Sequence, residues 1–154
     1  MALLFPCTYT AAGAVTAHAS DPRVYDGLWC TVTGNVTITF QQGPSIQFLG
    51  VPAGTLLPVK TRLITAITAT MIGLVGPSNS FCFNSGFILT DDDTAANIYD
   101  AFYINATGGG TNLAVVGRDS SGTVTITVAV GQLIPIRSKL VLAATTATVI
   151  GLRF

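Results

Sequence analysis

Few residues of this chain could carry out acid–base or nucleophilic chemistry. The single histidine, His18, lies among the first 20 residues, and any Ser-His-Asp or Cys-His arrangement would have to include it. Spacing along the chain places no nucleophile beside it. The densest acidic cluster is Asp91-Asp92-Asp93, and although acidic loops bind calcium, this run lacks the spacing of an EF-hand loop and is more typical of a solvated turn. The sequence therefore predicts a protein that is not an enzyme and has no catalytic residues, metal or cofactor.

The amino-acid composition limits the kinds of partner that the chain is expected to bind. Lys and Arg together number 7, as do Asp and Glu, so no net basic field attracts nucleic acid or an anionic membrane. Only 9% of residues are charged while 49% are hydrophobic, and a solvated monomer carries more charge than this. This balance favours a surface covered by copies of the chain or by a partner, with a monomer wetted by hydroxyl groups as the alternative. The longest apolar stretches, 63–76 and 140–152, are too short to cross a bilayer, so no membrane span is predicted.

Two stretches of the sequence are nearly the same. Thr68–Leu74 reads TATMIGL and Thr146–Leu152 reads TATVIGL. Tyr25-Asp26 recurs as Tyr99-Asp100, and the Leu-Pro-Val-Lys-x-Arg run that ends at Arg62 has a counterpart that ends at Lys139. Such spaced matches indicate a duplicated structural unit. We expect an N-terminal arm at 1–24, a β repeat at 25–75, a bridging segment at 76–98 and a second β repeat at 99–154.

Alternation of apolar and polar residues is the dominant pattern. Val36–Phe40, Ile46–Phe48 and Val124–Val128 have the period of half-buried strands, with Thr on the other face. Turn residues recur at the spacing of a sandwich or barrel. The sequence predicts an all-β fold, a β-sandwich or barrel built from two tandem repeats with internal pseudo-twofold symmetry, in which 25–154 forms one compact domain. One short helix is expected at 95–102.

Four of the seven basic residues occupy matching positions in the two repeats. They are Lys60 and Arg62 in the first copy and Arg137 and Lys139 in the second. A spacing of two places each pair on one face of a strand. These side chains either discourage unwanted pairing at a sheet edge or contact acidic groups on an underlying shell or a neighbouring subunit.

The N-terminal arm is apolar and poor in charge. Its residues Leu3, Leu4 and Phe5 are expected to pack against a partner or a neighbour's sheet, or to belong to an edge strand of the chain's own sandwich. The three cysteines, Cys7, Cys30 and Cys82, suit reduced thiols in a cytosolic assembly, with a Cys30–Cys82 pair across the core as the alternative.

The first copy resembles a known family at two places. Gly34–Thr39, GNVTIT, and Val51–Arg62, VPAGTLLPVKTR, followed by TATMI from Thr68, are similar to motifs of the head spike base proteins of tailed phages and gene transfer agents. The likeness covers about 50 residues of the first copy and is weaker in the second, where Val128-Ala-Val-Gly131 stands in place of Val-Pro-Ala-Gly. The resemblance implies a structural role on a capsid.

These observations lead to two functional hypotheses. The first is a non-enzymatic virion protein, a capsid decoration (cement) or head spike base protein that forms a homo-oligomer, a trimer in preference to a pentamer or hexamer. It would bind the major capsid protein on the capsid surface after assembly in the host cytoplasm. The second is a module of a phage fibre or adhesin whose loops bind a glycan or another ligand.

Overall fold

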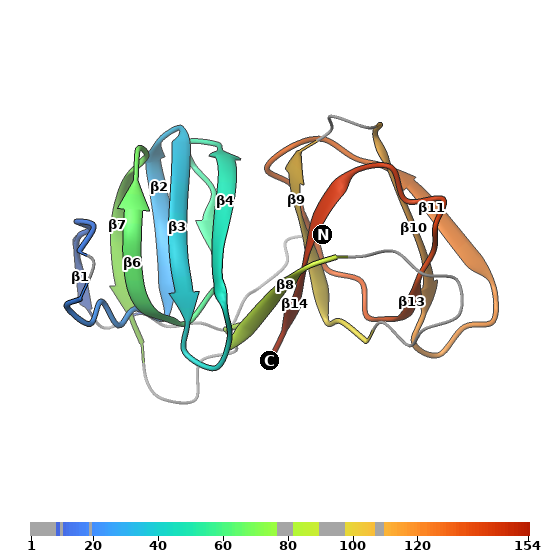
Figure 1. Cartoon of the computed structure of the whole chain (residues 1–154), viewed down its shortest axis with the longest axis horizontal. Helices are drawn as coiled ribbons and strands as arrows, with labels where there is room; N and C mark the ends of the chain where they lie inside the picture. The colour runs from blue at the N-terminus through green and yellow to red at the C-terminus, as the bar shows by residue number, and fades with distance from the viewer. Residues whose placement is uncertain (1–8, 10, 19, 77–81, 90–97, 107–109) are drawn as a thin grey trace. The chain divides into compact units, whose positions relative to one another are not determined.

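The computed structural model describes residues 9, 11–18, 20–76, 82–89, 98–106 and 110–154. These residues form an all-β, sandwich-like fold with four antiparallel sheets and no helix among them (Figure 1). The all-β class predicted from alternation and turn spacing is therefore confirmed. The chain divides into two compact units, residues 1–85 together with Phe154, and residues 86–153.

The first unit contains two sheets. One has the strand order β1 (Ala11–Ala14), β7 (Thr70–Val75), β2 (Gly27–Val32) and β5 (Leu56–Leu57), and the other has the order β4 (Ser45–Val51), β3 (Gly34–Phe40) and β6 (Thr61–Ile67). The alternation of apolar and polar residues along β3 correctly predicts its buried face. Val36, Ile38 and Phe40 are all fully buried. The ring of Phe40 lies 6.2 Å from that of Phe48 on β4, centroid to centroid.

The second unit repeats this arrangement. One sheet has the strand order β12 (Leu133–Ile134), β9 (Ala101–Ala106), β14 (Thr148–Arg153) and β8 (Ser85–Ile88). The other has the order β11 (Thr123–Thr127), β10 (Asn112–Gly117) and β13 (Ser138–Val141). Its core draws side chains from both sheets, among them Phe102 and Ile104 of β9 and Leu113 and Val115 of β10. Burial of these side chains removes apolar surface from water and holds the two sheets together.

Matching residues of the two copies make matching hydrogen bonds. The Asp26 N–H donates to the Leu74 carbonyl at 2.8 Å, and the Asp100 N–H donates to the Leu152 carbonyl at 2.9 Å. Each copy thus has two sheets of its own, in the same strand order, which differs from the single sandwich that we expected both copies to build together. The pseudo-twofold relation between the copies stays a prediction.

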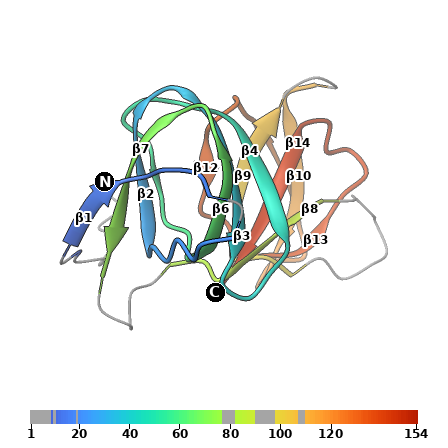
Figure 2. The ribbon, with the colours of Figure 1, turned by 60° about the vertical axis from the view of Figure 1, so that its left-hand side comes forward.

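The structural repeat begins earlier than the sequence comparison suggested. β1 and β8 start 74 residues apart, as do Tyr25 and Tyr99, and each adds an edge strand beside the TAT strand of its copy. The Val15 N–H donates to the Met71 carbonyl at 3.1 Å and the Leu89 N–H to the Val149 carbonyl at 3.0 Å. Figure 2 shows β1 lying alongside β7. The strand β1 of the N-terminal arm and the strand β8 of the bridging segment therefore occupy corresponding places in the two units.

The glycine in each TAT strand has a packing role. Gly73 lies beneath the ring of Tyr25, and Gly151 lies beneath the ring of Tyr99, so a Cβ atom at either glycine would overlap the ring. The backbone of each tyrosine is fixed in turn, since the Thr61 N–H donates to the Tyr25 carbonyl at 2.9 Å and the Ser138 N–H donates to the Tyr99 carbonyl at 2.9 Å. In each copy, the glycine of the repeated TAT phrase thus packs against the tyrosine of the repeated Tyr-Asp pair.

One sequence prediction about local structure is wrong. The short helix expected at 95–102 is not formed by the part of it that the structure describes, because Tyr99 bridges to Ser138 and β9 begins at Ala101. Pairing with β14 and the packing of aromatic side chains override the local helix signal there. The half-buried strand predicted at 124–128 is formed as β11, in which Ile126 packs against the core and Val128 just after it is buried, while Val124 is 46% exposed on this edge strand.

Candidate interaction surface

Only one basic residue of each predicted pair lies within a strand. Lys60 precedes β6 and Arg137 precedes β13, so only Arg62 and Lys139 lie within strands. The chain leaves one sheet after β5 and joins the other at β6, where Thr61 pairs with Phe40. The strand period on which the same-face expectation rests therefore covers only one residue of each pair, and the expectation stays a prediction.

The basic residues also differ in their partners. Arg137 makes an ion pair with Asp100 in its own unit, with 3.4 Å between Nε and Oδ1. Within the described part of the chain, Lys60, Arg62 and Lys139 make no ion pair. β6 and β13 are edge strands of their sheets, so both interpretations of the charges, edge protection and contact with a partner, stay open.

Several predicted positions lie outside the described residues. These are the arm residues Leu3, Leu4 and Phe5 and the acidic run Asp91–Asp93. The neighbouring part of the arm does form an edge strand, since Ala11–Ala14 pairs with β7 of its own unit. Among the residues that the structure describes, no three His, Cys, Asp or Glu side chains gather as ligands for a metal.

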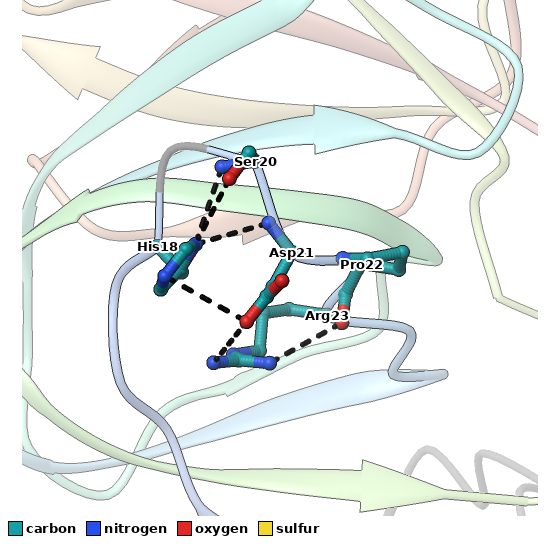
Figure 3. Close-up of polar contacts among 5 residues, drawn as sticks. All are labelled: His18, Ser20, Asp21, Pro22 and Arg23. Atoms are coloured by element: carbon teal, nitrogen blue, oxygen red, sulfur yellow. Dashed lines mark hydrogen bonds and ion pairs between the residues drawn. The ribbon is translucent and has the colours of Figure 1, made fainter.

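His18 lies in an exposed turn with Ser20 and Asp21 beside it (Figure 3). Its Nδ1 atom accepts the Asp21 N–H at 3.0 Å and the Ser20 N–H at 3.3 Å, while Nε2 lies 3.6 Å from the Asp21 carboxylate. The Ser20 hydroxyl is 3.5 Å from the same Nδ1 atom. Because this lone pair already accepts two backbone N–H groups, it is poorly placed to take a proton from Ser20.

The turn is extended by Arg23, whose Nη2 lies 3.7 Å from the Asp21 carboxylate. A hollow of about 210 Å³ opens beside the turn and is lined by Ser20, Pro22, Arg62 and Leu63. The Arg23 N–H donates to the Arg62 carbonyl at 3.0 Å, which holds the turn against β6. These contacts hold His18 and Arg23 against the edge of the sheet.

The two cysteines that the structure describes are buried and are not joined by a disulfide, so the alternative Cys30–Cys82 pair is not formed. The Cys30 Sγ–H donates to the Val32 and Val51 carbonyls at 3.2 and 3.4 Å. Burial raises the pKa of this thiol, and the hydrogen bond with Val32 offsets part of that rise. Cys30 is accordingly a packing residue in its thiol form.

An apolar row crosses the outer face of the four-stranded sheet of the first unit. Leu28 and Cys30 point into the core, so Trp29 between them points outward, where it is 39% exposed. The register places Trp29 opposite Leu56 on one side and Ile72 on the other, and Ile72 opposite Ala14. We call Leu56, Trp29, Ile72 and Ala14 the Trp29 row. Adjacent apolar pairs of this kind form a continuous surface across the sheet.

The corresponding row of the second copy has a different environment. Leu133 and Ile150 flank Tyr103 in the same register, and Tyr103 and Ile150 are both fully buried. These two side chains lie on the opposite face of their sheet from Phe102 and Val149, which belong to the core of the unit. The same position in the repeat is thus an exposed surface in one copy and a buried one in the other.

Sequence reasoning overlooked the Trp29 row although one signal was present. The repeat aligns Trp29 with Tyr103 and Ile72 with Ile150, so large apolar side chains recur at positions that alternation assigns to the outer face. An outward-facing position that is aromatic in both copies indicates a surface that becomes covered. The pairing of β1 with β7, which completes the row, needed the tertiary structure.

Within the described residues, no helix is long and apolar enough to cross a membrane. Comparison of the chain with protein-family models, with curated proteins and with solved structures finds no match.

Proposed function

We propose that this chain is a non-enzymatic structural protein of a tailed-phage virion, which oligomerises on the outside of the capsid and stabilises it as a decoration or head spike base protein. The observation that carries the proposal is the Trp29 row, an apolar surface that spans the four strands of one sheet. The resemblance of residues 34–39 and 51–62 to head spike base proteins supports the same role.

The physical basis of the role is burial of apolar surface. A protein with 9% charged residues has few charges to desolvate when a face is covered. Each Å² of apolar surface removed from water contributes about 25 cal/mol before association costs are subtracted. A cement protein on a capsid occupies many equivalent sites at once, so a modest free energy at each site adds up over the whole shell.

The position of the exposed tryptophan bears on the alternative function. A glycan-binding module of a fibre or adhesin would place aromatic side chains on the loops at one end of the sandwich. Trp29 lies in the middle of β2, on the flat face of a sheet. That position favours a flat protein contact over a loop-built ligand site.

A gradient experiment tests the proposal. The chain is co-expressed with the major capsid protein of the same genome, and assembled shells are separated from unassembled protein on a sucrose gradient. We expect the chain to sediment with the shells in a fixed ratio to the capsid protein. If shells assemble and the chain stays at the top of the gradient at low and at moderate salt, the proposed role is wrong.

A further inference from the structure

A short extended segment of the first unit is covered by another part of the same unit. Val59, which follows β5, makes a parallel bridge with Phe83. The Phe83 N–H donates to the Pro58 carbonyl, and the Lys60 N–H donates to the Phe83 carbonyl, both at 2.8 Å. Pro58 and Val59 are buried, and Phe83 itself is only 4% exposed. The segment around Phe83 thus serves as a short added strand within this unit.

The second unit contains the same segment with the same local turn. Residues 135–137 are the counterparts of 58–60 in the repeated Leu-Pro run. The Val59 N–H donates to the carbonyl two residues before it at 2.9 Å. The Ile136 N–H does the same at 3.0 Å. The backbone therefore bends alike in the two copies.

The inner side of the segment is bonded alike in both units. In the first, the Gln41 N–H donates to the Lys60 carbonyl at 3.0 Å. In the second, the Arg118 N–H donates to the Arg137 carbonyl, also at 3.0 Å. The two segments therefore have the same relation to the strands β3 and β10 beside them.

The outer side of the segment differs between the units. The Pro135 carbonyl and the Arg137 N–H occupy the places of the two groups that Phe83 bonds in the first unit, and no described residue bonds either of them. Pro135 is exposed and Ile136 is only half-buried, in contrast to their buried counterparts. A segment with unpaired backbone groups along one side is a template for an added strand.

A further hydrogen bond extends the template. The Gln42 N–H donates to the Asn84 carbonyl at 3.1 Å, so the added strand of the first unit is held at two consecutive residues. The counterpart of Gln42 is Asp119, because each directly follows the residue that bonds the inner side of the segment. Asp119 is exposed, and its N–H makes no hydrogen bond to the part of the chain that the structure describes.

From these observations we propose that residues 135–137 bind an extended segment of a partner protein in parallel, as the Phe83 segment is bound in the first unit. The central residue of the bound segment is large and apolar, because it covers Pro135 and Ile136. It is not proline, because its N–H donates to the Pro135 carbonyl. Residues 82–84, which have this pattern, are already bound in their own unit, so the occupant is another protein and not a second copy. The inference goes beyond the proposed function, since it holds for any partner with this segment.

A peptide with the chemistry of the natural cover tests the edge. The probe is the peptide of residues 82–86 with Cys82→Ser, added to the full-length, isotopically labelled chain while backbone amide NMR spectra are recorded. A second peptide, which also carries Phe83→Pro, lacks the central N–H and the aromatic ring. We expect the first peptide to bind in the millimolar range and the second to bind at least about 5-fold more weakly. Equal binding of the two peptides would overturn the inference.

The duplication supplies an internal control for the same spectra. We expect the amide signals of Arg137 and Asp119 to move with added peptide. The signals of Lys60 and Gln42 should stay in place, because the chain's own segment already accepts their N–H groups. An Arg137 signal that does not move, or one that moves no more than that of Lys60, would show that the edge of the second unit accepts no strand.

A pair of variants tests the edge from the other side of the contact. Arg137→Pro removes the N–H that the bound segment needs, whereas Arg137→Ala keeps it, and both variants lose the ion pair with Asp100. With both variants folded by circular dichroism, we expect the peptide to bind Arg137→Pro about 5- to 10-fold more weakly than Arg137→Ala. Equal binding would contradict the proposed hydrogen bond. The proline-containing peptide tests the same bond without any change to the chain.

Sedimentation distinguishes the partner from a second copy and the edge from the proposed function. If Arg137→Pro self-associates at least about 5-fold more weakly than Arg137→Ala, a second copy occupies the edge and the assignment to another protein is wrong. Equal self-association of the two variants, together with unequal peptide binding, supports the assignment. A chain that binds the peptide at Arg137 but never sediments with capsid shells supports the inference and contradicts the proposed function.

Discussion

The substitution Trp29→Thr tests the surface on which the proposed function depends. Trp29 contributes the largest side chain of the Trp29 row, and threonine is a good strand former that matches the neighbouring positions of β2. The side chain projects from the outer face and is 39% exposed, so its removal leaves the core of the unit intact. We therefore expect a folded protein whose ability to associate is reduced.

The size of the effect follows from the exposed area. A tryptophan offers about 250 Å² in all, so the 39% that is exposed corresponds to about 100 Å². At about 25 cal/mol per Å², covering that area stabilises the contact by about 2.5 kcal/mol. The association constant should then fall by up to about 60-fold for each contact that buries Trp29.

Sedimentation equilibrium of the purified chain over a range of concentrations measures this change. Val124→Thr is the matched control, because Val124 is 46% exposed on β11 and lies outside the Trp29 row. Its association should stay within about 2-fold of the wild type. If Trp29→Thr associates as well as the wild type while its circular dichroism spectrum is unchanged, Trp29 is not in the contact and the reasoning from the row is wrong.

Three further predictions concern packing, charge and the buried thiol. Gly73→Ala should destabilise the fold by about 1–3 kcal/mol in urea denaturation, because its Cβ overlaps a tyrosine ring. Gly13→Ala, whose Cβ meets nothing within 4 Å, should change stability by less than about 1 kcal/mol, and equal effects would contradict the packing argument. Replacing Lys60 and Arg62 together by alanine should lower the amount of chain bound to shells by about 5-fold at low salt and by less at high salt; unchanged occupancy in gradients favours the edge-protection interpretation. Because burial raises the pKa of Cys30, stabilisation from its protonated thiol is present below the unfolded pKa and is lost as the pH rises above it. The thiol should react with iodoacetamide at least 10-fold more slowly in the folded chain than in urea, and equal rates would show that it is not shielded.

The sequence allowed the fold class to be predicted because it depends on local pattern. Alternation alone marked Val36, Ile38 and Phe40 as one face of a strand, and all three are fully buried. The repeated phrase predicted that Gly73 and Gly151 occupy matching positions, and each lies beneath a tyrosine ring. A sequence pattern with a period of two matches the observed burial wherever a strand is straight and one of its faces is packed.

The proposed contact surface depends on pairings between segments far apart in the sequence. Alternation could place Trp29 on an outer face, but only the register of β5, β2, β7 and β1 aligned it with Leu56, Ile72 and Ala14. The same holds for the bridge that Phe83 makes with Val59, which the local pattern at neither residue predicts. The sequence by itself determined which side chains alternate and which segments repeat. The tertiary structure decided which edges are paired and which faces are covered, because hydrogen bonding between strands joins residues that no local pattern relates.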